Sequence, residues 1–83
     1  MTLADRITVA PDIMQGKPVI RGTRITVDLI LTKLAMGASE NDVLDAFPHL
    51  TIEDIRAALV YAADTVSRAI VLLTGVGGGG VGV

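Results

Sequence analysis

The feature that most constrains the fold of this 83-residue chain is a series of helix start and stop signals in its middle part. Thr26 precedes an apolar stretch with helical spacing, and Gly37 follows that stretch where a glycine commonly ends a helix. Ser39 opens the next segment as an N-cap, and Pro48 ends it. Thr51 opens a third and longer segment. These signals predict helices near residues 27–36, 40–47 and 52–73.

The third predicted helix carries an apolar heptad seam. Its members follow one another at spacings of three and four: Ile52, Ile55, Leu59, Ala62, Val66, Ala69 and Leu73. A helix of ~20 residues spans about 30 Å, which is much longer than the short helix before it. We therefore expect its C-terminal half to project beyond the bundle as a partner or dimer interface, with four candidate residues, Val66, Ala69, Ile70 and Leu73.

The segment before the helices predicts a small β element over about residues 6–25. Residues 6–9 alternate polar and apolar side chains and include β-branched types, as a short strand does. Residues 18–20 and 23–25 are further extended candidates, separated by a turn in which Gly22 suits a positive φ. These short extended segments, joined by turns, make up the expected β element.

The predicted fold is mainly α: a three-helix helix-turn-helix bundle, homeodomain-like or winged-helix-like, preceded by the small β element. We expect it to occupy residues 1–73 as a single domain, with residues 74–83 forming a flexible glycine-rich tail. A core of this size is marginal, and the chain has no cysteine with which to form a disulfide. Association is the remaining route to stability, so a homodimer or a stable partner is expected.

The cations are concentrated near the N-terminus. Residues 1–33 carry a net charge of +2, and residues 34–83 carry −4. The stretch GKPVIRGTRI, residues 16–25, contains Lys17, Arg21 and Arg24 without an acidic residue. This asymmetry suggests two surfaces with different partners.

Two interpretations of this stretch remain open. Its cations can contact nucleic-acid phosphates or a base edge, and the candidate binding residues are Lys17, Arg21, Thr23, Arg24 and Lys33. Alternatively, it is a hairpin whose exposed positions are basic. The third helix carries Glu53 and Asp54 where a recognition helix would meet DNA, and capping explains these acids better. We expect the basic stretch to contribute more to DNA binding than this helix.

No catalytic, metal or cofactor site is expected. His49 is the only histidine and has no partner nucleophile, and the carboxylates at the helix starts are explained by capping. The stretch GKPVIRGT also lacks the lysine that follows the second glycine in a Walker A loop. The N-terminus lacks the apolar region of a signal peptide, and the apolar C-terminal run is too short to span a membrane. We expect a cytoplasmic protein that is not an enzyme.

Residues 6–64 resemble the domain-of-unknown-function family 433, small prokaryotic proteins regarded as VapB-like antitoxins of type II toxin–antitoxin systems. The matching motifs are GKPVIRGTRI (16–25), GAS (37–39), FPHLT (47–51) and IRAALVYA (55–62). The resemblance implies a winged- or homeodomain-like helical fold with an N-terminal β element, a dimer, and a toxin partner with a PIN-like nuclease fold.

Three hypotheses follow. The first is an antitoxin that represses its own operon as a DNA-binding dimer on operator DNA and neutralises a PIN-like ribonuclease toxin. The second is a protein-interaction module that masks its partner through the long third helix without binding DNA. The third is a small catalyst with an active site across a dimer axis, for which no residue argues. The sequence leaves open which element forms the dimer.

Overall fold

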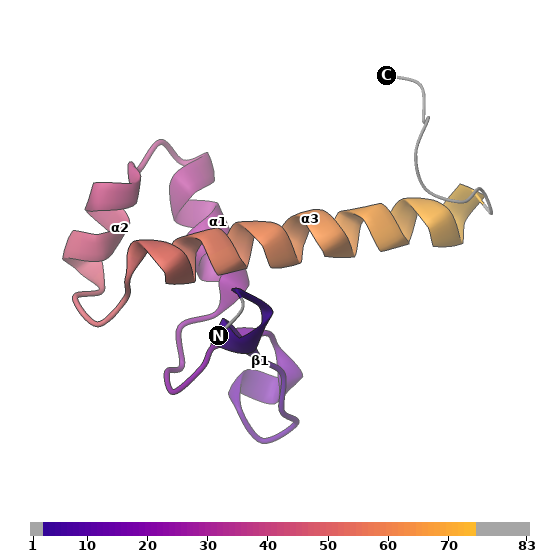
Figure 1. Ribbon diagram of the computed structural model, residues 1–83, viewed down its shortest axis with the longest axis horizontal. Coiled ribbons are helices and arrows are strands. Elements are labelled where there is room, and N and C mark those ends of the chain that lie inside the picture. Colours follow the sequence, from indigo (N-terminus) through magenta and orange to yellow (C-terminus); the bar gives the residue numbers. More distant parts are fainter. Residues whose placement is uncertain (1–2, 75–83) are drawn as a thin grey trace.

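The structure is a computed structural model that describes residues 3–74, with side chains for residues 3–69. Within this part, short 3-10 helices and strands lead into three α-helices, and the elements in chain order are η1 (Leu3–Arg6), β1 (Ile7–Thr8), η2 (Met14–Gly16), β2 (Val19–Ile20), α1 (Val27–Ala35), α2 (Glu40–Ala46) and α3 (Ile52–Thr74). Figure 1 shows the three helices beside the N-terminal β element, which confirms the predicted mainly α fold class. The tail expected at residues 74–83 lies outside the described residues, except for Thr74.

Side-chain caps start all three helices. The Thr26 hydroxyl caps α1 by accepting one backbone N–H. Ser39 and Asp42 form a capping box at α2, in which each side chain accepts the other residue's N–H at 3.0 and 2.9 Å. Thr51 and Asp54 repeat this exchange at α3, at 3.3 and 3.0 Å. Each cap contributes about 1 kcal/mol to stability.

Gly37 ends α1 with a Schellman motif. Its φ is +102°, a conformation that favours glycine. The Gly37 N–H donates to the Leu34 carbonyl and the Ala38 N–H donates to the Lys33 carbonyl, both at 3.0 Å. These two bonds satisfy carbonyls that the end of a helix would otherwise leave free. The short connection to α2 follows directly.

The N-terminal sheet is small, and β2 lies at its centre. β1 pairs with β2 in antiparallel register, with Ile7 opposite Ile20 and Thr8 opposite Val19. On its other side, Val19 forms an isolated antiparallel bridge with Thr26, immediately before α1. The extended segment expected at 23–25 contributes only the bridge at Thr26, one residue later, because the turn that ends at Thr23 takes up its first position.

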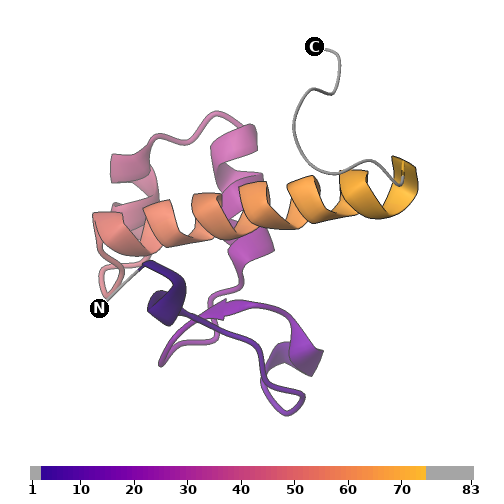
Figure 2. The same cartoon turned by 45° about the vertical axis from the view of Figure 1, so that its right-hand side comes forward.

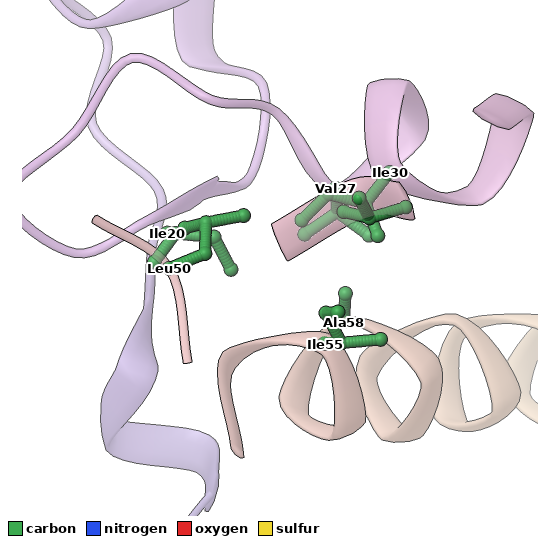
Figure 3. Packing of buried hydrophobic residues seen from close by; sticks show 7 residues of the cluster. Ile20, Val27, Ile30, Leu50, Ile55 and Ala58 are labelled. Carbon is green, nitrogen blue, oxygen red and sulfur yellow. The ribbon is translucent and has the colours of Figure 1, made fainter. Parts of the chain in front are cut away.

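The core lies where the sheet, the α2–α3 turn and all three helices meet (Figure 3). Ile30 of α1, Val43 of α2 and Ile55 of α3 are completely buried. The full cluster is Ile20, Val27, Ile30, Val43, Leu50, Ile55 and Ala58. These residues come from segments far apart in sequence, so the core couples the β element to the helices.

The C-terminal half of α3 runs past the rest of the domain. Figures 1 and 2 show it, in orange and yellow, extending alone beyond the other elements. Every residue from Ala63 to Ala69 is exposed. The buried part of α3 is Asp54, Ile55, Ala57 and Ala58, whereas Leu59 of the heptad seam is exposed. The heptad positions of α3 are thus buried at Ile55, whereas the next one, Leu59, is exposed. None of the helices in the described part has the length and apolarity that a membrane span requires.

Candidate nucleic-acid interface

The basic stretch forms a tight turn between β2 and α1. The Thr23 N–H donates to the Ile20 carbonyl at 3.0 Å, and Gly22 at the third position has a φ of +78°. Arg21 is not among the residues with positive φ, so this is a type II turn. Beyond it, the Ile20 N–H donates to the Ile25 carbonyl at 2.9 Å. The turn therefore holds its cations on a hydrogen-bonded backbone.

Thr23 supports this turn from within. Its hydroxyl donates to the Ile20 carbonyl at 2.7 Å and accepts the Ile25 N–H at 3.0 Å. Because the hydroxyl already serves two backbone groups, the geometry favours a structural role for Thr23. These bonds do not support its predicted role as a nucleic-acid contact.

Arg21 is exposed at the second position of the turn and is tied to the N-terminal segment. Its backbone N–H donates to the Arg6 carbonyl at 2.8 Å, and its side-chain Nε donates to the Asp5 carbonyl. The first bond fixes the backbone of Arg21, and the second fixes the direction of its side chain. The guanidinium is therefore positioned before any ligand binds.

Arg24 lies on the other side of Gly22. Its side chain is exposed and makes no hydrogen bond or ion pair with any described residue. It borders a hollow of about 340 Å³ whose other lining residues are Thr8, Ile13, Val19, Gly22 and Thr23. Arg24 is therefore a positive charge that is available to a ligand.

Lys17 is held against the start of α1. Its Nζ lies 3.5 Å from the Asp28 carboxylate, and both side chains are exposed. The hydrogen bond with the Thr26 hydroxyl is the main cause that holds the pKa of Asp28 below its usual value. Desolvation opposes it, and the Lys17 charge lowers the pKa further. An exposed pair of this kind is worth about 0–1 kcal/mol, so a phosphate can compete for the lysine.

Lys33 does not lie with the other cations. It is in the last turn of α1, six residues beyond Val27, which is about 9 Å along the helix axis. Its Nζ lies 5.8 Å from the centroid of the Phe47 ring, within range of a cation–π contact. The structure thus groups Lys17, Arg21 and Arg24 around β2 and places Lys33 at the opposite end of α1.

An ion pair that sequence reasoning missed changes the electrostatics of α3. Arg6 Nη1 lies 3.1 Å from Asp54 Oδ1 and 3.5 Å from the Thr51 hydroxyl. Asp54 was expected only to cap the helix, and it does so while also pairing with Arg6. The start of α3 is therefore less acidic than its sequence suggests, with Glu53 and Arg56 exposed there.

The predicted partner interface is described only in part. Val66 and Ala69 are exposed on the projecting part of α3. The side chains of Ile70 and Leu73 lie outside the described ones. A separate apolar groove of about 400 Å³ lies between the N-terminal segment and α3, lined by Ala4, Ile7, Val9, Ala57, Val60, Tyr61 and Asp64. Sequence reasoning missed this groove because it joins segments some fifty residues apart.

The described side chains bring together no group of three or more histidine and acidic residues that could hold a metal ion.

Comparison with known proteins agrees with this fold. The model of a family described as "Protein of unknown function (DUF433)" matches residues 7–62. "Uncharacterized protein y4eO" of Sinorhizobium fredii (strain NBRC 101917 / NGR234) is 45% identical over 56 residues, which are 68% of this chain and 25% of the relative. The chain thus spans about a quarter of the length of that curated relative.

A solved structure is also similar. It is the crystal structure of a DUF433 member protein from Anabaena variabilis ATCC 29413, with 32% sequence identity and a TM-score of 0.68. The similarity covers 78% of this chain and 67% of the other. The family match includes the basic turn and the start of α3 but ends at residue 62, before the exposed Val66.

Proposed function

This chain belongs to the DUF433 family, and we propose that it is a DNA-binding regulator of the VapB-like antitoxin type. In this proposal it acts in the cytoplasm as a homodimer, represses its own operon and neutralises a PIN-like ribonuclease toxin. The observation that carries the proposal is the type II turn, which presents Arg21 and Arg24 on either side of Gly22, with Arg24 making no ion pair to any described residue.

The rigidity of the turn supports phosphate binding. Ordering a flexible arginine on a ligand costs side-chain entropy, and part of that cost is already met where hydrogen bonds fix the backbone and the side chain. Arg21 is fixed by both its backbone N–H and its Nε. Arg24 has no described protein partner to give up. Arg21 is therefore preorganised for a phosphate, and Arg24 can bind a second one without giving up a contact to a described residue.

The expected salt dependence follows from counting these contacts. A dimer has two copies of the turn and hence four arginines at phosphates. The slope of log K against log salt is then about −3.6, so affinity falls roughly 100-fold between 50 and 200 mM salt. Lys17 makes this slope more negative if it exchanges its ion pair with Asp28 for a phosphate contact.

The start of α3 supplies a secondary contact. Arg6 neutralises Asp54, which removes one of the two charges that would repel phosphate there. Arg56 is exposed two residues further along α3. In this arrangement the basic turn contacts the DNA backbone directly and α3 lies beside the DNA. The turn therefore contributes most of the binding energy.

The test is a fluorescence-anisotropy titration with the DNA upstream of the protein's own gene. The Arg21→Glu/Arg24→Glu variant is compared with Arg56→Glu, which makes the same type of charge change on α3. We expect the double variant to lose at least 100-fold in affinity and Arg56→Glu to lose less than tenfold. A larger effect at Arg56 would move DNA binding to α3, and no binding by the wild type would overturn the proposal.

A second candidate function is favoured by the exposed apolar side chains of α3. Leu59, Val60 and Val66 are all exposed, and Val60 also lines the 400 Å³ groove. These features fit a module that masks a partner through α3 without binding DNA. Two measurements identify such a module. Its Arg21→Glu/Arg24→Glu variant inhibits the nuclease toxin as fully as the wild type does, and its wild type shows no affinity for DNA.

A further inference from the structure

We propose that the projecting part of α3 pairs in antiparallel orientation with α3 of a second copy of this chain. The contact surface, here called the seam, consists of Leu59, Ala62, Val66 and Ala69. This assigns the dimer interface to α3 rather than to the β element. The inference concerns association alone and does not require DNA binding, so absence of DNA binding would leave it standing. A monomeric protein would overturn this inference and would also remove the homodimer of the proposed function.

The seam is an apolar surface without a partner among the described residues. Leu59 is 43% exposed and Val66 is 58% exposed. Ala62 is half-buried and Ala69 is exposed. Ile52 and Ile55 precede these residues in the same three-and-four spacing and pack in or against the core. The seam therefore continues the core surface outward along the helix, onto the part that projects alone in Figures 1 and 2.

The charges of the projecting helix lie away from the seam. Asp64 and Arg68 each lie two residues from Val66, which is about 200° around the helix axis. They pair with each other at 2.9 Å. Ala63 and Thr65, which lie on either side of the seam, carry no charge. A partner on the seam thus meets an uncharged face, with the ion pair left in solvent.

The spacing of the seam residues fits α3 of a second copy of this chain. Apolar residues at alternating intervals of three and four interlock with a helix that has the same spacing, and α3 of another copy meets this condition. In antiparallel pairing, Leu59 faces Ala69 of the second copy and Ala62 faces its Val66. Every layer then combines one larger and one small side chain. In parallel pairing each residue would instead face its own copy. Layers of two leucines or two valines would then alternate with layers of two alanines, and the layers would differ in width.

Alanine in each layer also permits a close approach of the two helices, near the lower end of the usual 8–10 Å range. The size of the domain makes such burial valuable, because a chain of about 80 residues buries a smaller share of its surface on folding than a larger domain does. Two of the four seam residues, Val66 and Ala69, lie beyond residue 62, outside the part of the chain that the family model matches.

Sedimentation equilibrium tests this interface with a matched pair of variants. Val66→Asp and Val60→Asp each place a carboxylate at an exposed valine of α3, and Val60 is 52% exposed, similar to Val66. We expect the wild type and Val60→Asp to be dimers at micromolar concentration. Val66→Asp should weaken the dimer at least about 100-fold while retaining its helical circular dichroism, because its charge enters the seam. A monomeric wild type, or equal loss in both variants, would overturn the proposal.

Cross-linking tests the orientation. The chain contains no cysteine, so any disulfide reports on introduced residues. Antiparallel pairing predicts that a mixture of Leu59→Cys and Ala69→Cys proteins forms the mixed disulfide rapidly under mild oxidation. Leu59→Cys alone should form its own disulfide at least tenfold more slowly. Rapid self-cross-linking of Leu59→Cys with no mixed product would contradict the antiparallel arrangement.

Discussion

Arg6 and Asp54 form an ion pair with 3.1 Å between Nη1 and Oδ1, across 48 residues of sequence. Asp54 is 8% exposed and simultaneously accepts the Thr51 N–H in the cap of α3. One carboxylate thus starts the long helix and attaches the N-terminal segment to it. The basic turn is connected to the same point, because the Arg21 N–H donates to the Arg6 carbonyl. The orientation of the candidate DNA-binding surface therefore depends on this pair.

Arg6→Ala should destabilise the fold by roughly 2–3 kcal/mol, because it leaves the Asp54 carboxylate nearly buried without its counter-ion. Urea denaturation monitored by circular dichroism measures this change. Arg68→Ala is the matched control, since the pair of Arg68 with Asp64 is exposed on both sides and worth at most about 0.5 kcal/mol. Equal losses in the two variants would show that the Arg6–Asp54 pair has no special role in stability.

Gly22→Ala should lower stability by about 1–2 kcal/mol, the cost of a left-handed conformation for a residue with a Cβ. A Cβ at this position would meet no atom within 4 Å, so the loss arises from the backbone alone. Gly22→Asn should lose less, because asparagine tolerates this conformation better than alanine. Thermal unfolding of the three proteins gives the order directly, and equal stability of glycine and alanine would rule out a strained turn.

The stability contributed by Asp28 should depend on pH. Its pKa in the folded protein lies below the usual 3.8, so its charge stabilises the fold at neutral pH. This contribution is fully present above about pH 5 and is lost as the pH falls through the folded-state pKa. The stability difference between wild type and Asp28→Asn should therefore shrink between about pH 5 and pH 2. An NMR titration in which Asp28 has a midpoint above 3.8 would contradict this assignment.

Ser39→Ala should reduce stability by about 1 kcal/mol, because α2 loses the side-chain half of its capping box. Ser39→Thr retains the hydroxyl and should lose only a few tenths of that. The free energy of unfolding in urea provides the comparison. If alanine and threonine behaved alike, the hydroxyl would not be the stabilising group at this position.

The features that were predictable from the sequence are local ones. Ser39, Thr51 and Gly37 act on backbone groups within a few residues, so their types and spacing predicted the helix ends to within about one residue. The positive φ of Gly22 was predictable for the same reason. A turn or cap is determined by short-range geometry that the sequence displays directly.

The features that were not predictable depend on packing between distant segments. The Arg6–Asp54 pair required knowing that the N-terminal segment crosses the start of α3. The separation of Lys33 from the other cations required the direction of α1, and the exposure of Leu59 required the rotation of α3 about its own axis. Heptad spacing identified the apolar side of α3 but not whether its partner lay in the same chain.

The most direct test of the account is the salt dependence of DNA binding by wild type, Arg24→Ala and Arg56→Ala. If Arg24 contacts one phosphate in each copy of a dimer, its removal should make the slope of log K against log salt less negative by about 1.8. Arg56→Ala removes only the secondary contact on α3 and should change the slope by less than Arg24→Ala does. Unaltered slope in Arg24→Ala would contradict the central claim that the turn around Gly22 binds the DNA backbone.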